Sequence, residues 1–285
     1  MKSLLLLLAC SALEAQSLRI LAIGAHPDDC DIKMGGTAAL FAKMGHAVKF
    51  LSITNGDAGH HEMGGGPLAR RRYLETQESL RRLGIEEYQV LDNHDGELMP
   101  SIEVRRQVIR AIREWKADVV ITHRSNDYHP DHRNTGIVVQ DAAYMVVVPN
   151  VVSGTPALAK NPVFMYFSDA FQKPNPFKPD VAVDIDAVYE KKIDGLDAHV
   201  SQFYEWLAWV DGSIKDVPKD PKARREWLKS RRNFNVNPIS RAAIEKWYGK
   251  ERADKVKFVE AFEIGEYGRR PSDDELRRLF PMLGK

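Results

Sequence analysis

The feature that most constrains the fold of this chain is the alternation of short apolar runs with amphipathic helical segments. Apolar runs of strand length occupy residues 18–24, 47–53, 88–91 and 118–122. The segments between them have the three- or four-residue apolar spacing of helices, at residues 35–45, 68–83 and 102–115. Such βαβ units pack as a parallel sheet with helices on both faces. We therefore predict a Rossmann-like, three-layer α/β/α fold with a mostly parallel sheet through about residue 190.

The part of the chain after about residue 188 predicts a helical C-terminal extension. Residues 188–211 carry apolar side chains at helical spacing, which predicts one long amphipathic helix. Residues 222–232 (KARREWLKSRR) are locally basic, with Trp227 and Leu228 on the packing side. A solvated helix face is the favoured interpretation of this segment, and a positive rim for an acidic substrate is the alternative. Without a clear linker, residues 16–285 are expected to form a single domain.

The first fifteen residues (MKSLLLLLACSALEA) have the pattern of a secretory signal peptide. One basic residue, Lys2, precedes an apolar core, and Ala15 offers a small residue for cleavage. The core is too short to span a bilayer as a mature helix. We therefore expect an exported protein, periplasmic or extracellular, without a stable membrane span. Lipid attachment at Cys10 is the alternative, because residues 7–10 loosely match a lipoprotein cleavage site.

Charge and cysteine content exclude several classes of protein. With 41 Lys and Arg against 40 Asp and Glu, the formal net charge is +1, so no nucleic-acid partner is indicated. Two cysteines, Cys10 and Cys30, are too few for a disulfide scaffold or a cysteine-rich zinc site. The serine-hydrolase, phosphate-loop and dinucleotide motifs are absent from the sequence. The sequence places no constraint on the oligomeric state.

Two polar clusters follow the first and fourth predicted strands. The first reads His-Pro-Asp-Asp at residues 26–29, and the second reads His-Pro-Asp-His at residues 129–132. In a doubly wound sheet the opening strand usually lies beside the strand that follows the topological reversal, and ligands bind in the crevice at their carboxyl ends. We therefore expect the two clusters to meet, although about 100 residues separate them.

Imidazole and carboxylate groups without thiolate suit a metal site with an open coordination position. Zn²⁺ and Fe²⁺ both accept such ligands. His26 and Asp29 are candidate ligands, and Asp28 between them is placed to take a proton from water. Pro130 predicts a helix start, so His129 and His132 share one side of its first turn. One of these two histidines would bind metal and the other would face the substrate; the spacing alone does not choose between them.

The motifs at residues 25–29 (AHPDD), 34–37 (MGGT) and 129–132 (HPDH) resemble those of the PIG-L (LmbE-like) deacetylase family. Shorter matches follow at residues 54–57, 72–75, 95–98, 179–181, 199–202 and 260–263, so that the resemblance covers most of residues 18–265. It implies a zinc-dependent enzyme that removes acetyl from N-acetylglucosamine-type groups. It also implies a small-molecule or glycan substrate.

The resemblance also implies roles for individual residues. The implied zinc ligands are His26, Asp29 and His132. The implied catalytic residues are Asp28, as general base, and His129, which steadies the oxyanion or protonates the leaving amine. Asp131 would orient an imidazole. The implied substrate contacts are Arg72, Asp95 and Tyr128, the last of them assisting at the oxyanion.

Cys30 departs from the family pattern, which commonly has Glu after Asp-Asp. The role of that Glu is either lost or passed to Asp31, and a buried thiol is the favoured interpretation of Cys30 over a metal ligand. The leading hypothesis is thus a metal-dependent N-deacetylase of an amino sugar or glycoconjugate. Hydrolysis of another amide or ester, and a non-catalytic carbohydrate-binding protein, are the alternatives.

Overall fold

A seven-stranded sheet forms the centre of the computed structural model, which describes residues 17–284. The predicted leader, including Cys10, lies outside these residues. The strands are β1 (Arg19–Gly24), β2 (Ala47–Thr54), β3 (Glu87–Asn93), β4 (Val119–Thr122), β5 (Val163–Phe167), β6 (Val181–Asp184) and β7 (Val259–Gly268). Their order across the sheet is β3-β2-β1-β4-β5-β7-β6. The first five are parallel, and β7 runs antiparallel to both of its neighbours.

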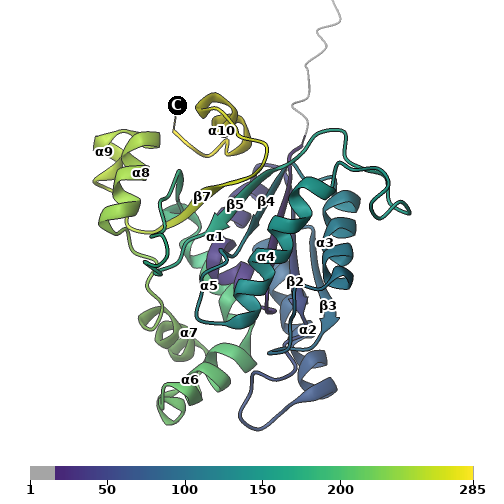
Figure 1. The fold of residues 1–285 in the computed structure, drawn as a ribbon. Coiled ribbons are helices and arrows are strands. Elements are labelled where there is room, and N and C mark those ends of the chain that lie inside the picture. Colours follow the sequence, from purple (N-terminus) through teal and green to yellow (C-terminus); the bar gives the residue numbers. More distant parts are fainter. Residues whose placement is uncertain (1–16, 285) are drawn as a thin grey trace, which may run out of the picture.

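Helices cover both faces of the sheet (Figure 1). One face carries α1 (Asp29–Lys43), α2 (Gly65–Leu83), α5 (Tyr189–Asp197) and α10 (Asp273–Leu279). The other carries α3 (Ile102–Trp115) and α4 (Pro130–Met145). The central strands are buried on both faces, as is usual for parallel strands covered by helices, and most of their side chains are apolar. The predicted three-layer α/β fold is confirmed.

β1 lies between β2 and β4, so the strand order reverses at this point. The register pairs Ile23 of β1 with Thr122 of β4, which places the carboxyl ends of the two strands side by side. The two His/Asp clusters leave the sheet at this edge, as the sequence predicts. In residues 17–284 no helix has both the length and the apolar character needed to cross a bilayer.

The prediction of one continuous helix over residues 188–211 is wrong. The chain forms α5, then a π-helix η2 (Ser201–Trp206) and a short α6 (Leu207–Val210). The break follows from a contact that the local pattern does not contain: the Ser201 backbone N–H and hydroxyl both donate to the Glu75 carboxylate on α2, at 2.9 and 2.6 Å. Glu75 thereby caps the new helical segment from outside.

Further helical segments follow as η3 (Ile214–Asp216), α7 (Pro221–Ser230), α8 (Pro238–Tyr248) and α9 (Lys250–Ala253). The chain then returns to the sheet as β7, a strand that the predicted helical extension does not include. Residues 259–268 (VEAFEIGEYG) begin with the apolar–polar alternation of a strand, which is the signal that would have identified it. In Figure 1, α6 and α7 lie near the end of the sheet where the parallel strands finish.

β7 also anchors α1. Helical geometry breaks inside α1 at Met34 (φ −148°), which leaves the next backbone N–H groups without helical partners. The buried Glu260 carboxylate accepts the N–H groups of Gly36 and Thr37 at 2.9 and 2.6 Å and pairs with the buried ammonium of Lys192. The second half of α1 is therefore capped by a carboxylate from the other end of the chain.

Candidate active site

Asp29, at the start of α1, directs one carboxylate oxygen to two backbone N–H groups and His123, and the other to His132. Its Oδ2 accepts the backbone N–H groups of Ala25 and His26 at 3.0 and 2.8 Å and lies 3.2 Å from His123 Nε2. Its Oδ1 lies 3.3 Å from His132 Nε2. Burial opposes ionisation of Asp29, yet His132 and His123 hold its pKa well below the usual range. The group is therefore a carboxylate at neutral pH.

His26, Asp29 and His132 bring two imidazole nitrogens and the two oxygens of one carboxylate close together, and we call these three groups the donor triangle. His26 Nδ1 lies 3.2 Å from His132 Nε2, and the nearest Asp29 oxygens lie 3.5 Å from His26 Nδ1 and 3.3 Å from His132 Nε2. Bonds of about 2.0–2.2 Å to a tetrahedral ion place ligand atoms about 3.3–3.6 Å apart. The separations between these three groups lie close to that range, so His26, Asp29 and His132 could together hold one divalent metal ion.

Other donor groups surround this triangle. A donor atom of His129 lies within 4.8 Å of donor atoms of His26 and His132, and one of His123 is equally close to Asp29 and His132. Of the two histidines that the sequence leaves open, His132 is buried beside Asp29 and His26, whereas His129 is half-buried at the cavity wall.

Carboxylates hold the outer nitrogens of both candidate histidine ligands. Asp127 Oδ1 lies 2.9 Å from His132 Nδ1, while Asp95 Oδ1 and Asp131 Oδ2 lie 3.0 and 3.4 Å from His26 Nε2. Such contacts place the ring proton on the outer nitrogen and turn the inner lone pair toward the metal position. Burial alone would lower the pKa of His26, but its contacts with Asp131, Asp29 and Asp95 raise it well above the ordinary value.

Asp131 joins two of the loops that carry the site. It is fully buried, and it accepts the N–H groups of Gly96 and Leu98 at 2.7 and 3.3 Å. The loop after β3, which carries Asp95, is thereby fixed to the first turn of α4. The structure accordingly places Asp131 where the sequence expects it, beside an imidazole, and it places Asp95 beside the same His26 ring.

Asp28 directly precedes Asp29 at the start of α1, and its side chain is buried. Burial raises the pKa of Asp28, and the negative charge of Asp29 raises it further, against the opposing effects of Arg72 and His199. A carboxylate whose pKa lies above its usual range is a better proton acceptor. The position and the chemistry both suit a general base.

His129 caps the N-terminus of α4. Its Nδ1 accepts the N–H of Asp131 at 3.2 Å, so the proton of the neutral ring sits on Nε2. Burial lowers the pKa of His129, and His26 and His132 lower it further, which favours that neutral form. Since the residue lines the cavity, its ring is suited to donate a hydrogen bond there.

A cavity of about 350 Å³ opens in front of His26 and His129. Its walls come from the carboxyl-end loops, which include His26, Asp95 and His129, and from Gln202, Trp206, Leu207 and Val210 of η2 and α6.

Arg72 and Tyr128 also line this cavity. The buried Arg72 guanidinium donates to the Gly59 carbonyl at 2.6 Å and to the Gln202 side chain. Gly56, at φ +71°, lets the Arg72 side chain pass, because a Cβ there would lie 2.7 Å from it. Tyr128 is 73% exposed and stands edge-on to the His129 and His132 rings. Partial burial raises the pKa of Tyr128 to about 12, so its hydroxyl stays protonated.

The family described as "PIG-L: GlcNAc-PI de-N-acetylase" matches residues 21–143, a segment that contains both His/Asp clusters. Diacetylchitobiose deacetylase of Thermococcus kodakarensis is 33% identical over 203 residues, which are 67% of this chain and 73% of that protein. The chain belongs to the PIG-L family.

Solved structures agree with this assignment. N,N'-diacetylchitobiose deacetylase from Pyrococcus horikoshii superposes with a TM-score of 0.65 at 27% identity, covering 88% of this chain and 84% of that one. The 4-carboxy-2-hydroxymuconate hydratase GalB from Pseudomonas putida gives a TM-score of 0.64 at 18% identity, with 90% of this chain and 99% of that one covered, and this likeness concerns the fold alone. Fold alone does not determine chemistry, so the function rests on the site.

Within this PIG-L protein, Asp127 and His123 are the site residues that sequence reasoning left without a role. Both flank the second motif, and a carboxylate two residues before His129 is the signal that could have identified Asp127. The wall formed by η2 and α6 was also missed, because it belongs to the segment predicted as one continuous helix.

Cys30 lies in the core of this PIG-L protein, away from the donor triangle. Its thiol faces the Leu51 carbonyl at 3.9 Å, and burial raises the pKa of the thiol well above the ordinary value. Asp31 contacts Tyr88, at 2.9 Å, and His199, at 3.2 Å, in a buried network. The buried-thiol interpretation of Cys30 therefore fits the structure.

Proposed function

We propose that this protein is a zinc-dependent hydrolase that removes the acetyl group from an N-acetylated amino sugar or glycoconjugate. The observation that carries the proposal is the donor triangle of His26, Asp29 and His132, whose His26 lines a cavity, together with the buried carboxyl of Asp28, the neighbour of Asp29 in the chain. Fe²⁺ suits the same donors and is the alternative metal.

A divalent ion held by these three residues would lower the pKa of water and polarise the acetyl carbonyl. Asp28 takes a proton from the attacking water, whose oxygen forms the new bond to the acyl carbon. The His129 Nε2–H, kept on that nitrogen by the helix cap, donates to the carbonyl oxygen as negative charge develops. The carbon–nitrogen bond then breaks, and the proton that Asp28 took from the water passes to the leaving amine nitrogen, giving acetate and the free amino sugar.

Substrate contacts are proposed for Arg72, Asp95 and Tyr128. Arg72 and Asp95 lie at the cavity wall, where a guanidinium and a carboxylate can bind sugar hydroxyl groups. The protonated Tyr128 hydroxyl at the rim can assist His129.

Acetate release from a panel of N-acetylated mono- and disaccharides, with and without a chelator, tests this proposal. Asp28→Asn is expected to keep bound metal and lose turnover, whereas His26→Ala is expected to lose the metal. Full turnover in Asp28→Asn would refute the assignment of the base. Sugar binding without product under any metal would favour the non-catalytic alternative, and a different released acid, identified by mass spectrometry, would favour another amide or ester.

We also propose that residues 1–15 are removed on export and that residues 16–285 act as one domain in the periplasm or outside the cell. The support is the tripartite pattern of the leader. N-terminal sequencing of the processed protein, compared with a Cys10→Ala variant, separates cleavage after Ala15 from lipid attachment at Cys10.

A further inference from the structure

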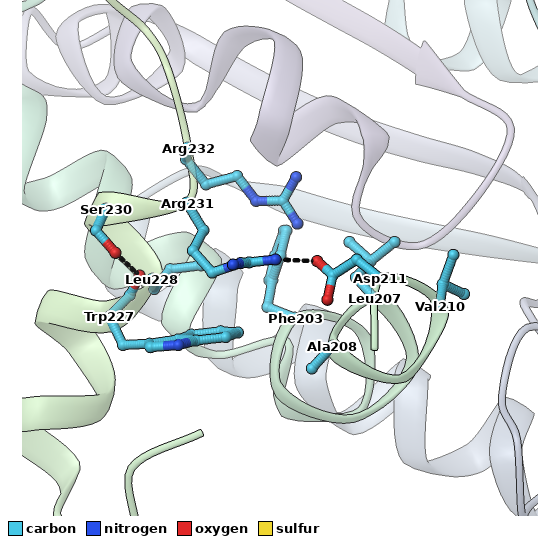
Figure 2. A pocket seen from close by; sticks show the side chains of 10 residues that line it. All are labelled: Phe203, Leu207, Ala208, Val210, Asp211, Trp227, Leu228, Ser230, Arg231 and Arg232. Atoms are coloured by element: carbon cyan, nitrogen blue, oxygen red, sulfur yellow. Dashed lines mark hydrogen bonds and ion pairs between the residues drawn. The ribbon is translucent and has the colours of Figure 1, made fainter. Parts of the chain in front are cut away.

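A second cavity adjoins the candidate active site. It has a volume of about 430 Å³ and lies between η2–α6 and α7 (Figure 2). Leu207 and Val210 line both cavities, so the second cavity and the active-site cavity share part of a wall. Its other walls include the aromatic rings of Phe203 and Trp227 and the guanidinium groups of Arg231 and Arg232. This volume is within the usual range for small-molecule sites.

Several cations of the basic segment 222–232 are neutralised by neighbouring acids. Arg225 and Lys229 pair with carboxylates on α5 and α7. Arg231 pairs with Asp211 across the second cavity, as the dashed line in Figure 2 shows. These side chains are paired within the protein and offer no free charge to a ligand.

Arg232 differs from them. Among residues 17–284 no hydrogen-bond acceptor or carboxylate contacts its guanidinium, and its buried Nε has no partner. The guanidinium lies 4.7 Å from the centre of the Phe203 ring. Burial lowers the pKa of Arg232, while the Asp28 and Asp211 carboxylates oppose this effect, so the charge stands within electrostatic reach of the proposed general base.

The Arg232 side chain is partly buried, and its Nε–H is shielded from water without an acceptor, which is unfavourable because that group has lost a hydrogen bond to water and gained none in return. Its planar fork of N–H groups matches a carboxylate or a phosphate group. The neighbouring walls of Leu207, Val210 and Trp227 are apolar and suit the C–H face of a sugar ring. The position thus combines an unused anion receptor with space for one more sugar unit beside the reacting one.

We propose that the second cavity is a subsite for an anionic neighbour of the acetylated sugar, whose carboxylate or phosphate group is bound by Arg232. This inference rests on the proposed deacetylase function, because it assigns the substrate of the same site to the anionic glycoconjugates. Arg232 acts as a specificity-determining residue, and the acetyl group is bound in the first cavity.

The test compares three N-acetylglucosaminyl disaccharides that differ only in the second sugar: glucose, glucuronate and glucose 6-phosphate. The wild-type chain is expected to show a higher kcat/KM for at least one of the two anionic substrates than for the neutral one. Arg232→Gln is expected to lower that anionic-to-neutral ratio about 10- to 100-fold, as loss of a charged hydrogen-bond partner implies. Arg232→Lys keeps the charge without the fork, so an intermediate ratio is expected. The glucuronate and phosphate arms identify the preferred anion.

Lys222→Gln is the matched control, because it removes one positive charge from the exposed start of α7, the helix that precedes Arg232. Its ratio is expected to equal that of the wild type. Equal losses on neutral and anionic substrates in Arg232→Gln would show that Arg232 acts through Asp28 and would overturn the proposal. An unchanged ratio would overturn it too. Thermal unfolding of Arg232→Gln and of the volume-matched Arg232→Met shows whether either variant has lost its fold.

A binding measurement separates this proposal from the proposed function. Glucuronate and glucose 6-phosphate are titrated calorimetrically into the metal-free full chain and into Arg232→Gln. Arg232-dependent binding without deacetylation of any substrate would support the subsite and refute the deacetylase. Deacetylation without any Arg232-dependent preference or binding would support the deacetylase and refute the subsite.

Discussion

Replacing Asp127 with alanine is expected to weaken zinc binding about 10- to 100-fold. Asp127 Oδ1 lies 2.9 Å from His132 Nδ1, and the contact orients the ring so that Nε2 faces His26 and Asp29. A hydrogen bond to a charged group contributes about 1.5–3 kcal/mol. At about 1.4 kcal/mol per factor of ten, this corresponds to roughly one to two orders of magnitude in affinity, which agrees with the effect of removing the outer partner of a metal-bound histidine.

The measurement is a competition for zinc between the protein and a chromogenic chelator at neutral pH. Asp127→Asn separates charge from orientation, because the amide oxygen still accepts a hydrogen bond from Nδ1–H. We expect this variant to lie between Asp127→Ala and the wild type. Asp141→Ala is the control. Asp141 lies on α4, the helix that carries His132, and pairs with Arg105 on α3, outside the site. Wild-type affinity in Asp127→Ala, or an equal loss in Asp141→Ala, would refute the reasoning.

Three further predictions concern the buried groups. Burial lowers the pKa of His123 in the folded state to about 4, against an ordinary value of about 6.5. Between these two pH values the unfolded state binds a proton that the folded state does not. The free energy of unfolding is therefore unaffected by His123 above pH 6.5 and falls as the pH drops toward 4. Denaturant unfolding of metal-free protein should therefore show about 3 kcal/mol more acid destabilisation in the wild type than in His123→Gln, and equal losses would contradict this. Lys192→Met leaves the Glu260 charge buried and unpaired, so it should lower the free energy of unfolding by about 3–5 kcal/mol. The loss should be smaller in the double variant that also carries Glu260→Gln. An equal loss in both variants would show that the unpaired charge is not the cause. Cys30→Ala should leave zinc stoichiometry and affinity unchanged, because the thiol faces the Leu51 carbonyl; loss of metal would make it a ligand.

The layered fold and the meeting of the two His/Asp clusters could be predicted from the sequence. Period and length identify the strands, and the topology of a parallel sheet brings the carboxyl ends of β1 and β4 together. The N-cap position of His129 follows in the same way from Pro130, because proline at a first helical position fixes where the helix begins.

Contacts that depend on tertiary packing could not be predicted. The position of Asp127 two residues before His129 makes it a candidate, but its contact with His132 depends on the path of an irregular loop, which the local sequence does not specify. The break before Ser201 depends on Glu75, which comes from a helix more than 100 residues earlier. Arg232 belongs to a basic run whose charges look equivalent in the sequence, and the positions of acids on neighbouring helices leave it without a partner.

The cap that Glu260 provides to α1 has a consequence for how the protein is made. Asp29 begins that helix, yet the carboxylate that completes its kinked second half is 224 residues away from Gly36. A ribosome has therefore translated all three proposed ligands long before it reaches the residue that secures the helix. We expect a nascent chain that ends before β7 to capture metal poorly, and maturation of the metal site to be one of the last events in the biosynthesis of the protein.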